Sequence, residues 1–146
     1  MKIAIGADHR GVNYKKAIKE MLEKDGIEVD DVGTYSEDSV DYPDFAQKVG
    51  EEVKEGKADF GVLICGSGIG VDIVANKVTG VRSVNAVNEK MAEMSRRHNN
   101  ANVISLGADM IDMETALNNV KKFVNTEFEG GRHERRVEKI HSLTGR

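Results

Sequence analysis

The stretch that decides the fold is Phe60-Gly61-Val62-Leu63-Ile64-Cys65-Gly66-Ser67-Gly68-Ile69-Gly70. Its apolar first half predicts a buried strand that ends on Cys65, the chain's only cysteine. A glycine-rich turn follows at once, and residues 71–77 predict a helix. The near-continuous apolar character of the strand is typical of the centre of a parallel sheet. We therefore expect one thiol at a sheet edge, beside backbone N–H groups that are free to bind an anion.

Strands and helices are predicted to alternate on both sides of this stretch. Short βα units imply a parallel sheet that is covered by helices on both faces and joined by right-handed crossovers. On the fourth helix, Met91 and Met94 are expected to face inward. The fold class is therefore α/β, a single Rossmann-like domain over residues 1–146, with a three-layer sandwich, a five-stranded parallel sheet and a C-terminal helical arm. The expected strands are 2–7, 27–32, 60–65, 81–87 and 101–106, and the expected helices are 13–25, 43–56, 71–80, 88–97, 115–128 and a terminal helix from residue 132.

Composition excludes several classes of function. The net charge is −4, and its two signs are interspersed, so no nucleic-acid partner and no polybasic membrane anchor are expected. The longest apolar run is far shorter than the roughly 18 residues of a membrane span. A single cysteine excludes an internal disulfide and a cysteine-rich zinc site. Because the N-terminus lacks the pattern of a signal peptide, we expect a cytoplasmic protein.

The functional groups are expected at one edge of the sheet. In open parallel sheets, ligands bind outside the carboxyl ends of the strands, near the point where the strand order switches. Here those ends carry polar and glycine-rich segments that predict a shared site at residues 8–9, 65–70, 85–88 and 107–109.

Cys65 and its glycine turn fit only some of the known chemistries. A lone cysteine is most often a small buried hydrophobe, but a helix N-terminus beside it favours the thiolate. The turn is G-x-G-x-G after a third strand, not the dinucleotide pattern G-x-G-x-x-G after a first strand. It lacks the Lys of a P-loop, and Val71 stands where a cysteine phosphatase needs Arg. An anion hole beside a thiol remains, which suits a developing oxyanion.

Other polar residues have an ordinary structural interpretation beside a functional one. Asp8 and His9 could form a simple strand-to-helix cap, and His98 and Asn99 could cap the end of a helix. Asp72 could complement the dipole of the helix in whose first turn it lies. The pair Arg132 and Arg136, four residues apart on one helical face, suits phosphate, although a charged C-terminal helix is usually only solvated.

Taken together, the motifs resemble the ribose-5-phosphate isomerase type B family and its sugar-phosphate isomerase relatives. They occur in the order of the family over nearly the whole chain. Each motif alone is weak, but their joint occurrence is specific. The segments that carry the resemblance are residues 5–9, 33–34, 40–44, 64–70, 75–77, 98–102 and 129–137.

The resemblance implies metal-free aldose–ketose isomerisation, without a cofactor, by a homodimer that often pairs into a tetramer. Cys65 matches the base that takes the proton next to the carbonyl. Ser67 and His98 would assist ring opening, with Asp8 as the counterpart of His98. The pocket would lie between subunits, and its small-molecule ligand would be a sugar phosphate. The enediolate oxygen would be held by the backbone N–H groups of residues 66–70, which are Gly66, Ser67, Gly68, Ile69 and Gly70.

The resemblance also implies binding residues for the sugar and its phosphate. Tyr42 and Asn99 would contact the sugar, and His9, Arg132 and Arg136 would hold the phosphate. Asp109, however, stands where many members have an Arg that helps to bind phosphate. An acid there would repel a dianion unless it points away or binds a sugar hydroxyl.

The expected reaction is the interconversion of ribose 5-phosphate and ribulose 5-phosphate. Asp109 keeps open an isomerase of allose 6-phosphate, galactose 6-phosphate or a free sugar. A sugar-phosphate-binding domain without turnover is a third hypothesis, which the presence of Cys65, Ser67, His98 and Asp8 disfavours.

Overall fold

The computed structural model describes all residues 1–146 and has five parallel strands in one sheet, in the order β2-β1-β3-β5-β4. The predicted fold class is confirmed, and β3 lies at the centre of the sheet as expected. The strands are β1 (Lys2–Ala7), β2 (Glu28–Asp31), β3 (Phe60–Cys65), β4 (Ser83–Asn85) and β5 (Val103–Gly107), and the helices are α1 (Val12–Lys24), α2 (Tyr42–Lys54), α3 (Ile69–Asn76), α4 (Glu89–Asn99), α5 (Met113–Val124) and α6 (Arg132–Thr144).

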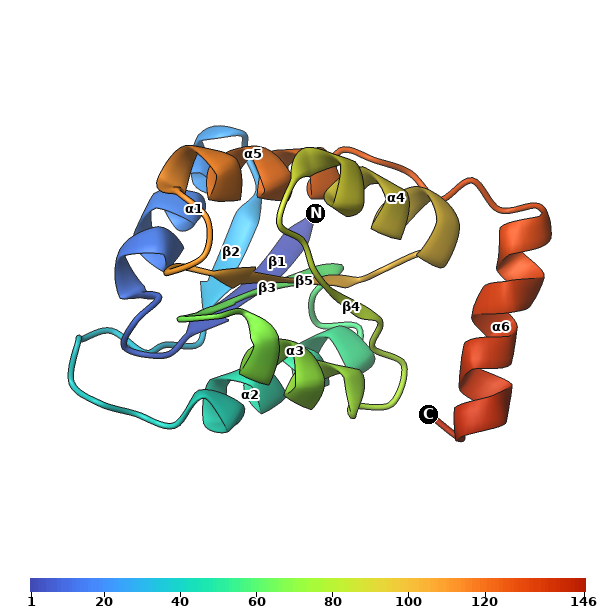
Figure 1. Ribbon diagram of the computed structural model, residues 1–146, viewed down its shortest axis with the longest axis horizontal. Coiled ribbons are helices and arrows are strands. Elements are labelled where there is room, and N and C mark those ends of the chain that lie inside the picture. The colour runs from blue at the N-terminus through green and yellow to red at the C-terminus, as the bar shows by residue number, and fades with distance from the viewer.

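Two layers of helices cover the sheet. Helices α1, α4 and α5 lie on one face, α2 and α3 lie on the other, and α6 stands apart at one end (Figure 1). The larger hydrophobic core lies under α1, α4 and α5 and includes Phe123, whose ring meets Phe60 edge-on at 5.4 Å between centroids. The second core lies under α2 and α3 and includes Cys65. Both faces of β3 are therefore buried, which explains its unbroken apolar sequence.

Strand register brings the predicted functional segments to one edge. Cys65 is level with Gly107 on one neighbouring strand, and Ile64 is level with Ala7 on the other. The turns after β1, β3 and β5 therefore begin side by side, because parallel strands end at the same edge. The turn at Gly11 packs against Ile64 so closely that a Cβ there would lie 2.7 Å from that side chain.

Helix starts follow from short polar side chains and from proline. The Asn88 side chain accepts a hydrogen bond from the N–H of Met91 at 2.9 Å, and Asp112 accepts one from Thr115 at 2.8 Å. Each satisfies one of the N–H groups that a helix leaves unpaired at its start. Pro43 lies in the first turn of α2, as the sequence predicts.

Two elements that follow β3 in the chain, α3 and β4, are shorter than expected. Helix α3 ends at Asn76 instead of continuing to residue 80, and β4 covers residues 83–85 instead of 81–87. The Asn76 side chain exchanges two hydrogen bonds with the backbone of Ser83, at 3.0 and 2.8 Å, and so turns the chain early. The N–H of Arg82 donates to the Asn102 side chain instead of to a strand.

Two helix ends were also misplaced. Helix α4 continues through His98 and Asn99 and stops at Asn100, which has a φ of 47°. Helix α5 ends at Val124, not at residue 128, because the Asn125 and Thr126 side chains bond to the carbonyl oxygens of Lys121 and Lys122. The predicted break at residues 130–131 and the terminal helix α6 are confirmed.

The expected inward orientation of Met91 and Met94 is wrong. Their side chains are 39% and 38% exposed, and α4 turns Ala92, Ser95 and Arg96 inward instead. The Arg96 guanidinium donates to the carbonyl oxygens of Thr126 and Ala101 and lies 4.7 Å from the Phe60 ring centroid. These bonds and this cation–π contact fix the inward face of the helix. None of the helices combines the length and apolar character that a membrane span needs.

Candidate active site

Cys65 is buried at the last position of β3, where the strand runs into the glycine turn. Its Sγ accepts a hydrogen bond from the N–H of Gly68 at 3.2 Å. The donor is the backbone amide at the N-cap of α3, so the sulfur lies at the N-terminus of that helix. The predicted thiol beside an N–H-rich turn is therefore present as a structural unit.

Two glycines make this unit sterically possible. Gly68 has a φ of 76°, and a Cβ there would lie 2.8 Å from the backbone of Leu106 and Gly107. At Gly107, a Cβ would clash with the carbonyl group of Ser67. The glycine turn is therefore pressed against the end of β5, which holds its N–H groups in fixed directions.

The N–H groups of the turn divide into two sets. Those of Gly68 and Ile69 are used internally, by the Cys65 sulfur and by the Ser67 hydroxyl at 3.1 Å. Those of Gly66, Ser67 and Gly70 donate to no protein acceptor. Three donors of the turn are thus left without a protein acceptor, as an oxyanion site requires.

A cavity of about 400 Å³ opens beside Cys65. Asp8 lines it from the turn after β1, where its Oδ1 accepts the N–H of Arg10 at 3.0 Å. Tyr42 lines it from the start of α2, and a Cβ on Gly70 would lie 2.5 Å from its ring. The cavity is lined by Asp8, Tyr42, Cys65, Gly66, Ser67, Ile69, Gly70 and Ile73.

Asp109 carries an ion pair that the sequence did not predict. Its carboxylate accepts a hydrogen bond from Arg10 Nε at 2.7 Å and also contacts Arg10 Nη2. His9, the neighbour of Arg10, accepts the N–H of Val40 on its Nδ1 at 3.2 Å. That bond leaves Nε2 of the neutral His9 imidazole as its N–H donor.

Asp72 is part of a partly buried polar network, not only a partner of the helix dipole. The Ser83 hydroxyl donates to its Oδ1 at 2.6 Å and lies 3.0 Å from the Ser105 hydroxyl. Burial raises the pKa of Asp72 above its ordinary value, and hydrogen bonds from the two serines oppose that rise. The network joins α3 to β4 and β5 behind the glycine turn.

Four of the predicted site residues lie at the opposite edge of the sheet. His98 and Asn99 occupy the last turn of α4, which leads into the beginning of β5, and Arg132 and Arg136 are exposed on α6. Cys65 is level with the end of β5. Since β5 extends from Val103 to Gly107, the two ends of the strand are roughly 13 Å apart. One chain therefore does not bring these four residues to Cys65.

His98 belongs to a separate cluster with Glu129 and His133. The rings of His98 and His133 stack with centroids 4.3 Å apart, and their Nε2 atoms lie 3.7 and 3.6 Å from the Glu129 carboxylate. Burial and, less strongly, the neighbouring His98 lower the pKa of His133. The three ligand atoms lie within 4.8 Å of one another, the only such group that could hold a metal ion. However, the ring planes differ by only 14°, so one ion could not lie in both planes unless a ring turned.

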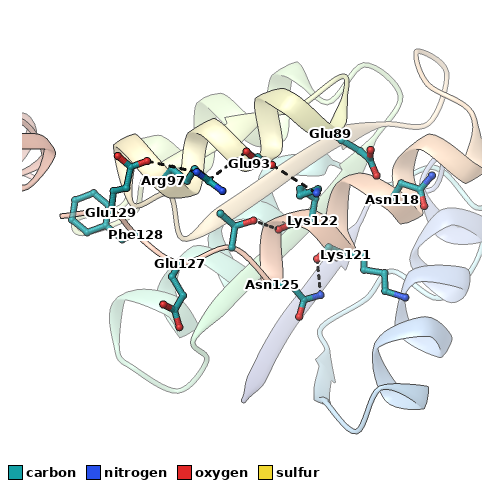
Figure 2. A pocket seen from close by; sticks show the side chains of 11 residues that line it. Glu89, Glu93, Arg97, Asn118, Lys121, Lys122, Asn125, Glu127, Phe128 and Glu129 are labelled. Atoms are coloured by element: carbon teal, nitrogen blue, oxygen red, sulfur yellow. Dashed lines mark hydrogen bonds and ion pairs between the residues drawn. The ribbon is translucent and has the colours of Figure 1, made fainter.

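A larger hollow of about 700 Å³ lies between α4, α5 and residues 125–129 (Figure 2). Four of its charged side chains form ion pairs. Glu93 contacts Arg97 at 3.3 Å and Lys122 at 3.7 Å, and Arg97 also reaches Glu129 at 4.0 Å. Because these paired side chains lie beside Glu89, Lys121 and Glu127, which carry both signs of charge, this surface favours no single class of ligand.

Arg10 and Ile73 are the site residues that the sequence analysis missed. Ile73 lies one turn beyond Ile69 on α3 and lines the same cavity, so its helical spacing could have indicated it. Arg10 directly follows Asp8 and His9, whose turn the sequence predicts to be part of the site. Its partner is 99 residues away in the sequence, so the ion pair itself had no local signal.

The whole chain is similar to known proteins. A family model described as Ribose/Galactose Isomerase matches residues 3–140. Ribose-5-phosphate isomerase B of Escherichia coli is 41% identical over 145 residues, which cover 99% of this chain and 97% of that protein.

Solved structures are similar over the same length. Ribose-5-phosphate isomerase B of Clostridium thermocellum has a TM-score of 0.97 and 49% sequence identity, over 99% of this chain and 98% of that one. The enzyme of the same name from Mycoplasma genitalium, solved with bound ribulose-5-phosphate, has a TM-score of 0.95 and 42% identity, over 99% of this chain and 96% of that one.

Proposed function

The chain belongs to the ribose/galactose isomerase family, and on that premise we propose that it interconverts ribose 5-phosphate and ribulose 5-phosphate. The observation that carries the proposal is the buried Cys65 thiol, which lies beside a cavity and next to three unpaired backbone N–H groups. This pairing of a base with an oxyanion site is what proton abstraction next to a carbonyl needs.

In the proposed reaction, the Cys65 thiolate removes the proton from C2 of the open-chain aldose. The electron pair of that C–H bond forms the C1–C2 double bond, and negative charge develops on O1. The free N–H groups of Gly66, Ser67 and Gly70 would hold that oxygen, and one such donor typically lowers a barrier by about 3 kcal/mol. The thiol then returns the proton to C1, the proton of the O2 hydroxyl is transferred to O1, and the C2–O2 carbonyl of the ketose forms.

Ring opening precedes this step and needs an acid at the ring oxygen and a base at the anomeric hydroxyl. Asp8 lines the Cys65 cavity and is available within the chain, together with the Ser67 hydroxyl. His98, the proposed acid, lies at the other edge of the sheet. The reaction therefore calls for His98 from a second copy of the chain.

A homodimer is the assembly we propose to complete the site. Ile69 and Ile73 line the Cys65 cavity, and their side chains are 53% and 54% exposed. Met91 and Met94 are also exposed on α4, whose last turn carries His98. A second copy that covered these apolar side chains would bury them and place its own residues beside Cys65. Pairing of such dimers into a tetramer stays a prediction.

The substrate's phosphate would lie away from the reacting carbons. We propose that His9 of one chain and the exposed Arg132 and Arg136 of the other hold it, because paired guanidinium groups bind phosphate oxygens well. Tyr42 of one chain and Asn99 of the other would contact sugar hydroxyls. Binding of the phosphate would orient C1 and C2 toward Cys65, so that binding energy promotes the reaction at the other end of the sugar.

A panel of sugars tests the proposal. Purified protein is assayed with ribose 5-phosphate, allose 6-phosphate, galactose 6-phosphate and free ribose, and kcat/KM is compared. The proposal predicts the highest value for ribose 5-phosphate, without added metal or cofactor. Binding of sugar phosphates in calorimetry, without turnover of any, would instead support a non-catalytic binding domain.

Asp109 favours a second candidate function. Its carboxylate stands beside the glycine turn, where it opposes a dianion. A preference for a six-carbon sugar phosphate or a free sugar in the same panel would identify that alternative. The proposed cytoplasmic location is tested separately, by fractionation of the cells that produce the protein.

A further inference from the structure

Arg10 and Asp109 form an ion pair that no step of the proposed reaction uses. Arg10 Nε donates to Asp109 Oδ2 at 2.7 Å, and Arg10 Nη2 contacts the same oxygen. The two side chains are 57% and 48% exposed. An exposed ion pair contributes little to the stability of the fold. Its position beside the Cys65 site instead indicates a role in ligand binding.

The pair stands directly over the glycine turn. A Cβ on Gly66 would lie 2.9 Å from both Arg10 Nε and Asp109 Oδ2. The Asp109 N–H donates to the carbonyl oxygen of Gly66 at 2.9 Å, and the Arg10 N–H donates to Asp8 Oδ1 at 3.0 Å. Both backbones are therefore fixed to residues of the Cys65 site, and the pair lies at its rim.

The charges of Arg10 and Asp109 determine which ligand groups bind at the rim of the site. Arg10 has five N–H donors, and Asp109 occupies donors on Nε and Nη2. The remaining N–H groups can still donate to a phosphate oxygen. A dianion that binds to them is also repelled by the adjacent Asp109 carboxylate, whereas a neutral hydroxyl can donate to that carboxylate.

We propose that Arg10 binds the group at the end of the substrate away from the reacting carbons, and that Asp109 is a specificity-determining residue. Asp109 holds the Arg10 side chain over the glycine turn and lowers the preference of the site for a phosphate dianion over a neutral hydroxyl at that end of the substrate. The inference rests on the proposed function, because it names the substrate property that this site distinguishes. In this inference, two residues of one chain discriminate between a phosphate dianion and a neutral hydroxyl, independently of the arginines on α6.

The variant Asp109→Asn tests this distinction. Asn is the same size and keeps an oxygen acceptor for Arg10, but it removes the negative charge. KM for ribose 5-phosphate should fall about three- to tenfold, since a like charge a few ångströms from the dianion is lost and salt screens part of the effect. The ratio of kcat/KM for ribose 5-phosphate to that for free ribose should rise by a similar factor. Arg10→Ala should raise KM for ribose 5-phosphate and lower that ratio.

Asp112→Asn is the matched control, because it removes a charge three residues away and Asn still caps α5. It should leave both values unchanged. An unchanged or higher KM in Asp109→Asn, or an unchanged KM in Arg10→Ala, would overturn the inference.

Calorimetric titration of the same variants with inorganic phosphate separates this inference from the proposed function. If the parent protein turns over no sugar phosphate but Asp109→Asn binds phosphate more tightly, the function fails and the inference stands. If ribose 5-phosphate is isomerised and Asp109→Asn does not tighten phosphate binding, the inference alone fails. If phosphate binds to neither protein, the inference fails as well.

Discussion

Glu52, on α2, is the residue whose pKa is shifted most strongly by folding. One of its carboxylate oxygens is buried without a hydrogen-bond partner. Burial, and then the nearby Asp30, raise the pKa of Glu52 from 4.5 to about 7. A pKa that is higher in the folded state means that the fold favours the protonated carboxyl. This contribution is therefore fully present below pH 4.5 and is lost as pH rises from 4.5 to about 7.

The variant Glu52→Gln should be more stable than the parent at pH 8 and equally stable at pH 4. The expected gain at pH 8 is about 1 kcal/mol, reduced by solvent screening, which corresponds to a rise in Tm of about 2–4 °C. Thermal unfolding at both pH values measures it. Glu55→Gln is the control, because Lys57 lowers the pKa of Glu55 and the variant should gain nothing at pH 8. A Tm for Glu52→Gln that is unchanged at pH 8 contradicts the prediction.

Single residues of the site differ in how far the sequence could reveal them. Cys65 was predictable, because an apolar strand and a glycine turn bracket it within eleven residues of sequence. The concern about an acid at position 109 was also visible in the sequence. Its partner Arg10 was not, since the contact joins residues 99 positions apart and depends on the register of three strands.

At the scale of elements, the glycine turn depends on its close approach to the end of β5. Gly68→Ala should lower the free energy of unfolding by about 2–3 kcal/mol, because it adds a left-handed backbone penalty to a clash with fixed backbone atoms. The new Cβ would lie 2.8 Å from Leu106 and Gly107 at a φ of 76°. Urea unfolding measures the loss.

Gly130→Ala is the matched control for that variant. Gly130 has a φ of 69° but no atom within 4 Å of a built Cβ, so it carries the backbone penalty without the clash. It should cost only about 1 kcal/mol. Equal losses in the two variants would show that packing against β5 does not support the turn.

Elements were predictable where hydrophobic periodicity defines them and less so where side-chain bonds end them. Strands β1 and β3 have the predicted bounds, because buried apolar runs mark both. The face of α4 was misassigned, since periodicity favoured the methionines, whereas the hydrogen bonds of Arg96 turned that residue inward. Such bonds join distant segments and have no periodic signal.

At the scale of the whole molecule, the alternating order of elements predicted the parallel sandwich. The exchange of β4 and β5 in the sheet was not predictable, because both orders satisfy the same hydrophobic pattern. That topology and the length of α4 place His98 at the edge opposite Cys65. A complete site therefore requires two chains, and this separation gives a direct test of the assembly.

Subunit complementation measures whether two chains share a site. The variants Cys65→Ala and His98→Ala should each be nearly inactive as homodimers. Mixed dimers, co-expressed with two different tags and purified through both, contain one intact site and one doubly altered site. They should recover about half of the parent activity per dimer. Mixed dimers as inactive as both homodimers would contradict a shared site, and a monomer by light scattering with full activity would contradict the dimer.

The most direct test of the central proposal compares the parent protein with Cys65→Ala in the isomerisation of ribose 5-phosphate to ribulose 5-phosphate. The proposed role predicts that the parent is active and that the variant loses roughly 10³-fold in kcat, with KM changed little because the binding groups remain. Circular dichroism verifies that the variant is folded. A folded Cys65→Ala protein that isomerises ribose 5-phosphate as fast as the parent would contradict the assignment of Cys65 as the base.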